Sequence, residues 1–245
     1  FLLDNEVEKL VHLAARPGVR PSLPNAKLYE EINVAGTLNM LEASISSNIK
    51  NFVFISSSSI YGNLAKTPWK EEFDPMPNSP YAASKLAGEA YVKTYAELYS
   101  LPTSALRYFS IYGIGQRPDL AIAKFSNSIL DGKFIEMFGD GKAMRDYTYI
   151  SDAVEGTISA LNKKFKFEVF NIGNSNPIPL HELISLLEKN LEKKAIIKKL
   201  PPQKGDLPNT YADISKAKRM LNYSPLIKIQ EGLKIYCKWL LNRVK

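Results

Sequence analysis

Residues 52–62 read Phe-Val-Phe-Ile-Ser-Ser-Ser-Ser-Ile-Tyr-Gly, four apolar residues followed at once by four serines. A short apolar run of this length is typical of a strand buried in a sheet. Similar runs lie at 9–13 and 103–108, and the segments between them, about 25–47 and 81–99, have apolar residues at helical spacing. Strand, helix, strand, helix, strand is the rhythm of a parallel sheet with right-handed crossovers.

Beyond about residue 115 this alternation gives way to a mixed pattern. We expect helices near 121–130, 152–161, 180–191, 214–221 and 230–242, and strands near 134–138, 169–172 and 195–200. The sequence therefore predicts an α/β protein with two parts. Residues 1–115 form a sheet domain, to which the chain returns from about 140 to 175, and residues 116–245 form mainly a smaller lobe.

Composition is that of an ordinary globular protein, with 245 residues and no run of about 18 apolar residues that could span a membrane. The single Cys237 cannot form an internal disulfide, so we expect a reducing, cytoplasmic location. The net charge is +7, but the late lysines form no aromatic-interleaved basic module, so we do not expect nucleic acid as a partner. The lack of a long apolar run likewise argues against a membrane partner. His12 and His181 are too few and too far apart to indicate a metal site.

Distinctive residues follow three of the expected strands where each strand ends. They are His-Leu-Ala-Ala at 12–15, the four serines at 56–59 and Tyr-Phe-Ser at 108–110. The carboxyl ends of parallel strands share one edge of a sheet, and ligands bind beyond that edge. A serine run alone would indicate a loop, but serines directly after a buried strand at this edge favour side chains that face a ligand.

Tyr81 and Lys85 lie four residues apart on one expected helix, so their side chains share a face. A phenol has an ordinary pKa near 10, and a nearby ammonium lowers that pKa by favouring the phenolate. Such a tyrosine can move a proton to or from a sugar hydroxyl while a nicotinamide cofactor takes or gives a hydride. This spacing occurs by chance in many helices, and the serines upstream are what favour a catalytic site.

Further motifs occur in order along the chain. They are Val-His-Leu-Ala-Ala at 11–15, Ser-Ser-Ser-Ser-Ile-Tyr-Gly at 56–62, Ser-Pro-Tyr-Ala-Ala-Ser-Lys at 79–85, Leu-Arg-Tyr-Phe at 106–109, Arg-Asp-Tyr-Thr-Tyr-Ile at 145–150 with Asp152, Phe-Asn-Ile-Gly at 170–173, and Gly-Asp at 205–206 before Tyr-Ala-Asp at 211–213. Together they resemble the extended short-chain dehydrogenase/reductase family that acts on nucleotide sugars. The resemblance implies a Rossmann-like sheet, a partial NAD-binding domain in residues 1–115 and a substrate-binding lobe.

The same resemblance implies a role for each matching residue. Tyr81 would be the catalytic base, Lys85 its partner and Ser57 the third catalytic hydroxyl. The residues expected to contact the cofactor NAD are His12, Leu13, Ala14, Ala15, Ser56, Tyr81, Lys85, Tyr108 and Phe109. The nucleoside diphosphate end of the substrate would be held by Ser110, Arg145 and Asp206. Asn33 would be a buried polar support, the alternative being an ordinary exposed asparagine.

Two of these assignments have alternatives in the residues themselves. Arg145 is a forked and always charged donor, which suits a diphosphate, but it could instead form a surface ion pair with Asp146 or Asp152. Asp206 follows a glycine, so it could bind a ribose or base, or equally serve as a turn residue.

The two residues directly after the catalytic serine indicate the branch of the family. Dehydratases place an Asp-Glu pair there, whereas this chain has Ser58 and Ser59, which favours epimerisation at C4 through a 4-keto sugar. The serine run and the segments with Arg20 and Arg117 most resemble the UDP-glucuronate 4-epimerase branch. Ser58, Ser59 and Ser110 would bind a C5 carboxylate. Arg20 and Arg117 would bind substrate anions or be ordinary surface arginines.

Several alternatives stay open. The substrate could be UDP-glucose or a UDP-N-acetylhexosamine, or the chain could be a non-catalytic nucleotide-sugar-binding module. The chain has no glycine-rich phosphate turn after a first strand, so the resemblance places about sixty residues and the first strands before Phe1. We therefore expect these 245 residues alone to bind NAD poorly and to be inactive. A homodimer is expected through the helix that carries Tyr81 and the helix before it, with apolar contacts from Tyr91, Tyr95 and Leu98 unless these belong to the core.

Overall fold

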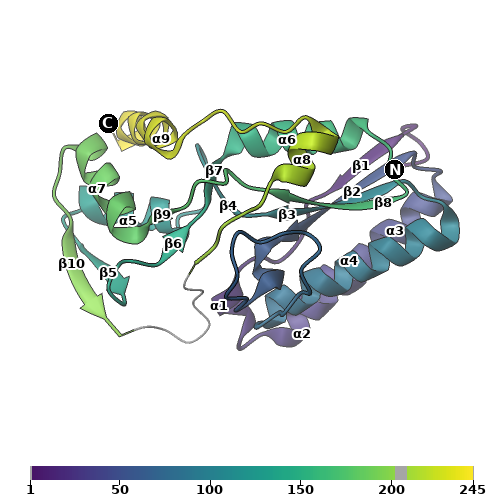
Figure 1. Ribbon diagram of the computed structural model, residues 1–245, viewed down its shortest axis with the longest axis horizontal. Coiled ribbons are helices and arrows are strands. Elements are labelled where there is room, and N and C mark those ends of the chain that lie inside the picture. The colour runs from purple at the N-terminus through teal and green to yellow at the C-terminus, as the bar shows by residue number, and fades with distance from the viewer. Residues whose placement is uncertain (1, 202–208, 245) are drawn as a thin grey trace.

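The computed structural model describes residues 2–201 and 209–244, and its centre is a parallel sheet (Figure 1). Four strands are hydrogen-bonded in the order β1-β2-β3-β8, and every neighbouring pair runs parallel. Their bounds are β1 (Lys9–His12), β2 (Asn51–Ser57), β3 (Thr103–Tyr108) and β8 (Phe167–Ile172). The expected α/β fold with a parallel sheet is confirmed.

Side chains of β2 alternate between the two faces of the sheet and so contribute to two separate cores. Phe52 and Phe54 pack with apolar residues of the helices on one face, whereas Val53 and Ile55 pack with those on the other. This alternation is the ordinary geometry of a strand. Because both faces are covered, the strand is a continuous apolar run rather than an apolar–polar alternation.

One face of the sheet is covered by α4 (Pro80–Tyr99) and by a second helical run (Figure 1). The second run consists of α2 (Ala26–Tyr29), η1 (Glu30–Ala35) and α3 (Gly36–Ser46). Apolar spacing predicted a single helix over 25–47, and it cannot reveal that η1 is a π-helical turn, a distortion that often marks functional sites. α4 approaches β2 closely at Gly88, where a Cβ atom would lie 2.5 Å from the Phe54 ring.

The opposite face is covered by α6 (Ile150–Asn162) and α8 (Ser215–Leu221) (Figure 1). Small side chains on these helices, Ala153 and Ala160 of α6 and Ala217 of α8, are fully buried in the core on this side of the sheet. The chain thus returns to the sheet after residue 115, first with α6 and β8 and later with α8.

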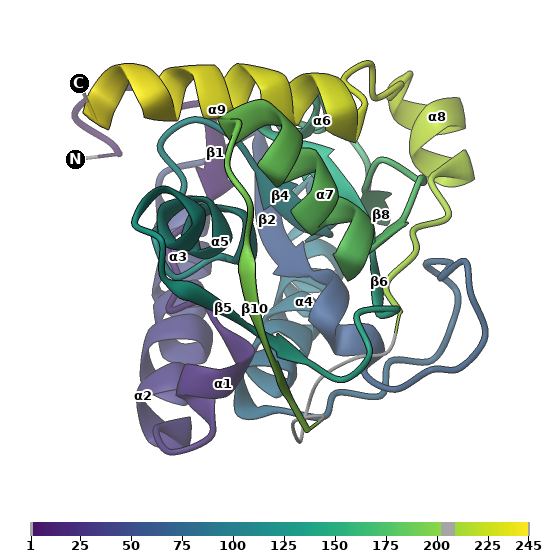
Figure 2. The same ribbon diagram turned by 90° about the vertical axis from the view of Figure 1, so that its left-hand side faces the viewer.

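A second lobe has its own apolar core beyond the carboxyl ends of the strands (Figure 2). Its helices are α5 (Ala121–Leu130), α7 (Leu180–Leu191) and α9 (Ile229–Val244). They pack with β5 (Phe134–Phe138), which pairs in parallel with β10 (Ile196–Leu200). These five elements lie close to the positions that apolar periodicity predicts.

Several short elements were not predicted from the sequence. They are α1 (Val19–Ser22), η2 (Ser58–Tyr61), β4 (Ser110–Tyr112), β6 (Met144–Arg145) and β9 (Ile178–Pro179), together with β7 (Tyr147–Tyr149). β4 pairs in parallel with β7, and β6 pairs antiparallel with β9. The chain therefore leaves the sheet at β3 and is tied at once to residues 147–149.

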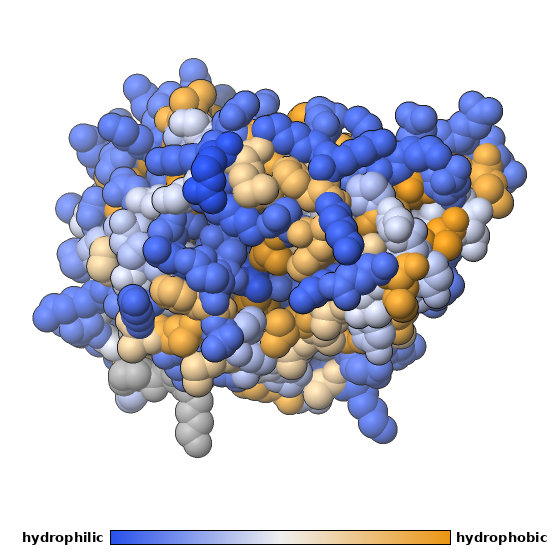
Figure 3. Space-filling view, turned by 45° about the vertical axis from the view of Figure 1, so that its right-hand side comes forward, coloured by the Kyte–Doolittle hydropathy of each residue, from blue (hydrophilic) through white to orange (hydrophobic). Residues whose placement is uncertain are grey.

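The surface is mainly hydrophilic on the face drawn in Figure 3, with smaller apolar areas between the polar side chains. No helix within residues 2–201 and 209–244 is long and apolar enough to cross a bilayer.

Candidate active site

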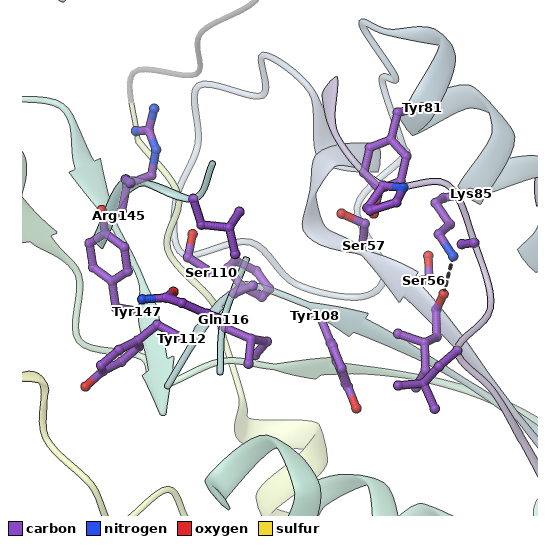
Figure 4. Close-up of a pocket in the computed structure, with 18 of the residues that line it drawn as sticks. Ser56, Ser57, Tyr81, Lys85, Tyr108, Ser110, Tyr112, Gln116, Arg145 and Tyr147 are labelled. Carbon is purple, nitrogen blue, oxygen red and sulfur yellow. Dashed lines mark hydrogen bonds between the residues drawn. The ribbon is translucent and has the colours of Figure 1, made fainter. Parts of the chain in front are cut away.

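A cavity of about 450 Å³ lies between the two lobes at the carboxyl ends of β2 and β3 (Figure 4). Its walls come from both lobes. The described residues that line it are Leu13, Ala15, Pro17, Ile55, Ser56, Ser57, Tyr81, Lys85, Tyr108, Phe109, Ser110, Ile111, Tyr112, Gln116, Leu120, Ala121, Ile122, Arg145 and Tyr147. Ten of the residues predicted from the sequence are thus brought together, namely Leu13, Ala15, Ser56, Ser57, Tyr81, Lys85, Tyr108, Phe109, Ser110 and Arg145.

Tyr81 and Lys85 reach the cavity from the first turns of α4. This helix begins with Ser79, whose hydroxyl accepts a hydrogen bond from the Ala82 amide, and with Pro80 at its first position, which are favourable start signals. The buried Lys85 ammonium donates to the Ile55 carbonyl at 2.7 Å and lies over the Phe54 ring (Figure 4). The two side chains therefore face the end of β2 together.

The Tyr81 phenol is hydrogen-bonded to Ser57, and burial raises its pKa. The bond with Ser57 and the charge of Arg117 act in the opposite direction, while the nearby Tyr29 raises the pKa further. The sequence predicted a lowered pKa from the nearby ammonium. The net direction is the reverse because burial, which the spacing of Tyr81 and Lys85 cannot reveal, is the largest effect.

Burial lowers the pKa of Lys85 to about 8, as is usual for a buried cation. The negative charge of Glu89 opposes that fall. The ammonium form therefore predominates at pH 7, where it can donate hydrogen bonds and attract negative charge.

The serine run divides between the strand and the short helix that comes after it. Ser56 and Ser57 are the last residues of β2, and both line the cavity. Ser57 accepts hydrogen bonds from the Ser59 amide at 3.2 Å and the Ser59 hydroxyl at 2.9 Å. Ser58 and Ser59 lie in η2 outside the lining, and Ser59 supports Ser57 from behind.

The segment after β1 contributes Leu13 and Ala15 to the cavity, whereas Ala14 is exposed outside it. His12 is also outside the lining, because strand alternation turns it toward α3, where its Nε2 lies 3.1 Å from the Thr37 hydroxyl. Burial and the charge of Lys85 lower the pKa of His12 to about 4, so the ring is neutral at pH 7.

Asn33, in the π-helical turn η1, fixes the segment after β1. Its side chain is buried, accepts from the Arg16 amide at 2.7 Å and donates to the Arg16 carbonyl at 3.1 Å. Its amide nitrogen also donates to the Ser84 hydroxyl at 2.9 Å, which links this segment to α4. Asn33 is therefore the buried polar support that the sequence predicted, rather than an exposed helix residue.

The residues predicted to bind substrate anions are only partly brought together. Arg145 and Ser110 line the end of the cavity opposite to Tyr81 (Figure 4). Arg117 is exposed and forms a forked ion pair with Asp119 at 2.7 and 3.0 Å. Arg20 is exposed, with its guanidinium over the Phe138 ring of β5. Asp206 lies outside the described residues.

Several residues of the site were not singled out from the sequence. Tyr112, Gln116 and Tyr147 line the cavity beside Arg145 (Figure 4). The Tyr112 hydroxyl points away from the cavity toward Gly232 of α9, and Gln116 forms a side-chain hydrogen bond with Tyr236. No local pattern reveals this, because their burial depends on the second lobe.

No group of three or more His, Cys, Asp or Glu side chains within the described ranges is arranged to hold a metal ion. The arrangement instead offers a phenol, an ammonium and hydroxyls at one end of the cavity and a guanidinium at the other (Figure 4). Such a site can move a proton at a hydroxyl group while it holds an anionic group some distance away.

Comparisons with known proteins agree with this geometry. The chain is 44% identical over 235 residues to a UDP-glucuronate 4-epimerase of Thermodesulfobacterium geofontis, covering 95% of this chain and 72% of that protein. A UDP-glucuronic acid 4-epimerase from Bacillus cereus, solved with UDP-glucuronic acid and NAD, matches with a TM-score of 0.90 and 38% identity. The match covers 95% of this chain and 76% of that chain. A UDP-glucose 4-epimerase from Thermotoga maritima, solved with UDP-glucose, matches with a TM-score of 0.91 and 34% identity. That match covers 96% of this chain and 77% of the other.

A family profile matches residues 1–173, the part of the chain that supplies the serine run, Tyr81, Lys85 and Arg145. That span is well over half of the chain and includes all four strands of the sheet. On these grounds the chain belongs to the NAD dependent epimerase/dehydratase family.

Proposed function

We propose that this chain epimerises a UDP-sugar at C4, with UDP-glucuronate and UDP-galacturonate as the favoured pair and NAD as the cofactor. The observation that carries the proposal is the convergence of Tyr81, Lys85 and Ser57 on one cavity at the carboxyl edge of the sheet. The similarity to UDP-glucuronate 4-epimerases over 95% of the chain supports the choice of reaction.

The cavity suits the nicotinamide end of NAD. Leu13, Ile55 and Phe109 give it apolar walls that fit a flat ring, and the Lys85 and Tyr81 donors suit the hydroxyls of a ribose. When bound, NAD supplies hydride transfer and a positive charge next to the tyrosine. In this proposal residues 1–115, with the returns from about 140 to 175, hold the cofactor, and residues 116–245 mainly hold the sugar nucleotide.

Tyr81 would take the proton of the C4 hydroxyl and later give it back to the 4-keto oxygen. Its raised pKa means that the protonated phenol, the form that the return step requires, predominates at neutral pH. The forward step requires the phenolate, which the hydrogen bond from Ser57 and nearby positive charge favour. Ser57 would therefore hold both the phenol and the substrate oxygen, with Ser59 fixing its orientation.

Arg145 would bind the diphosphate, with Ser110 nearby. A guanidinium at the far end of the cavity from Tyr81 suits a substrate whose charged group lies several atoms from the reacting carbon. The Ser110 hydroxyl could donate a hydrogen bond to a C5 carboxylate, so that no oppositely charged side chain has to be buried there. The binding of the nucleoside end by Asp206 stays a prediction. So does substrate binding by Arg20, Arg117, Ser58 and Ser59, and cofactor binding by His12 and Ala14.

A homodimer also stays a prediction. Of the three apolar side chains on α4 that it invokes, Tyr91 and Leu98 are exposed, by 38% and 70%. Tyr95 is buried and its hydroxyl is bonded to Glu42 of α3, so that side chain already serves the contact between the two helices.

The choice of sugar is tested with a panel of substrates. We expect the full-length protein to convert UDP-glucuronate with a kcat/KM at least about tenfold above that for UDP-glucose or UDP-N-acetylglucosamine, a difference of about 1.4 kcal/mol in binding of the transition state. Product formation is measured by chromatography of the two epimers. Turnover of the neutral sugars alone would overturn the choice of a hexuronate but not the reaction.

A further inference from the structure

The helix that carries Tyr81 and Lys85 also carries a carboxylate that is buried behind the cavity. Glu89 of α4 forms a forked ion pair with Arg107 of β3, with contacts of 2.8 Å between Nη2 and Oε2 and 3.0 Å between Nε and Oε1. The side chains are only 6% and 5% exposed. Desolvating two charges is costly, so a buried pair of this kind is weak support for stability and raises the question of what else it does.

Glu89 is connected to two residues that line the cavity. It lies one helical turn after Lys85, which places both side chains on the same face of α4. Its Oε1 atom also accepts a hydrogen bond of 2.5 Å from the Ser56 hydroxyl. Figure 4 shows Ser56 and Lys85 next to each other at the end of β2.

Arg107 is held in a fixed position by a chain of buried hydrogen bonds. Its Nη1 atom donates to the Tyr61 hydroxyl at 2.9 Å and to the Glu71 carbonyl at 3.1 Å. The Tyr61 hydroxyl in turn donates to the Asn171 side chain at 2.7 Å. A guanidinium fixed in this way holds its partner carboxylate in one place on the inner face of α4.

The charged and titratable groups around Lys85 come from three elements. Glu89 and Tyr81 lie on the same helix, His12 faces it from β1, and Arg107 reaches Glu89 from β3. His12 is neutral at pH 7 because its pKa is about 4, and the Tyr81 phenol carries no charge when protonated. Burial lowers the pKa of Lys85 to about 8, and the group that opposes this fall is Glu89.

We propose that the Glu89 carboxylate, held in place by Arg107, keeps the Lys85 side chain a cation inside the cavity. The inference rests on the proposed function only where it predicts turnover; the charge of Lys85 itself can be measured without substrate. Glu89 is a positioning residue, since it acts through Lys85 and lies outside the cavity lining.

The test is an NMR titration of Lys85 in the full-length, NAD-loaded protein, with labelled lysine side chains and a Lys85→Arg variant to identify the signal. We expect a midpoint near pH 8 in the unchanged protein. In Glu89→Gln the midpoint falls by about one to two pH units, the effect of one charge about 6 Å away in a partly polar interior. Glu89→Asp retains the carboxylate, so the midpoint stays within about half a pH unit of the unchanged protein.

The matched control is Asp152→Asn. Asp152 is also a buried carboxylate, but it lies on α6 and accepts a hydrogen bond from the Ile227 amide at 3.0 Å. We expect this variant to lose thermal stability without a change in the Lys85 midpoint. If Glu89→Gln does not fold because Arg107 is left unpaired, the double variant Glu89→Gln with Arg107→Gln removes both charges. We then expect a smaller fall in the Lys85 midpoint, because loss of the Arg107 cation partly offsets loss of the Glu89 anion.

The titration and the kinetics together separate the effect of Glu89 on the pKa of Lys85 from the catalytic role of Lys85. A lower Lys85 midpoint, together with an alkaline limb of the kcat/KM profile that moves to lower pH by the same amount, supports both. A lower midpoint with an unchanged profile supports the pair and contradicts the catalytic role of Lys85. An unchanged midpoint in a folded Glu89→Gln overturns the inference, whatever the turnover, and so does a midpoint that does not fall in the double variant where the single variant does not fold.

Discussion

Replacing Tyr81 by phenylalanine is expected to lower kcat for the UDP-sugar by about 10²- to 10⁴-fold, with KM changed by no more than a few-fold. The substitution removes one hydroxyl and leaves the ring, which lies edge-on to Tyr29 with ring centroids 6.2 Å apart. The cavity therefore keeps its shape while the proton carrier is lost. Steady-state kinetics of the NAD-loaded protein give both constants.

Tyr99→Phe is the matched control for this experiment. Tyr99 is the last residue of the same helix and is 51% exposed, far from the cavity lining. We expect its kcat to stay within about twofold of the unchanged protein, since surface substitutions have small effects. Retention of kcat in Tyr81→Phe would remove Tyr81 from the reaction, and ligand binding without any turnover in the unchanged protein would favour a non-catalytic module.

Arg145→Ala is expected to raise KM for the UDP-sugar by about 30- to 100-fold while kcat changes little. Loss of a charge-assisted contact to a diphosphate costs about 2–3 kcal/mol of binding, which the ground state and the transition state share. Arg145→Lys should recover part of the loss, because a lysine supplies the charge but not the forked geometry. Initial rates at varied substrate concentration measure the change.

Arg219→Ala, an exposed arginine of α8 away from the cavity lining, is the control for a general loss of positive charge. We expect its KM to match that of the unchanged protein. An unchanged KM in Arg145→Ala would show that the diphosphate lies elsewhere, and a fall in kcat alone would place Arg145 in the chemical step.

The sheet and the placement of Tyr81, Lys85 and Ser57 at one cavity could be predicted because local patterns determine them. Continuous apolar runs identify strands that are covered on both faces, and the four-residue spacing of Tyr81 and Lys85 places both on one helical face. The end of a parallel strand is a place where ligands bind, so Ser57 could be assigned from its position after the β2 run.

Other features depend on contacts that no local pattern contains. His12 directly precedes a residue of the cavity, yet strand alternation turns its ring toward Thr37. Arg20 packs over Phe138, a residue of the second lobe more than a hundred positions away. The net rise in the pKa of Tyr81 comes mainly from burial by surrounding elements, and the groups that oppose it are Ser57 and Arg117 rather than Lys85.

The shortest elements were also beyond sequence patterns. β6 and β9 have two residues each and pair across more than thirty positions, so their formation depends on the lobe around them. Arg107 stands in a motif that was quoted for other residues, and Glu89 was not singled out from the sequence. The burial of this pair became visible only when α4 and β3 were packed together.

Turnover in D₂O is the most direct test of whether Tyr81 moves the proton of the C4 hydroxyl group or a proton on the C4 carbon. If Tyr81 handles only the hydroxyl proton, UDP-galacturonate formed from UDP-glucuronate carries protium at C4, because solvent deuterium exchanges only with the hydroxyl groups. Proton NMR and mass spectrometry of the isolated product give the result. Deuterium at C4, or no epimer from any UDP-sugar, would contradict the assignment of Tyr81.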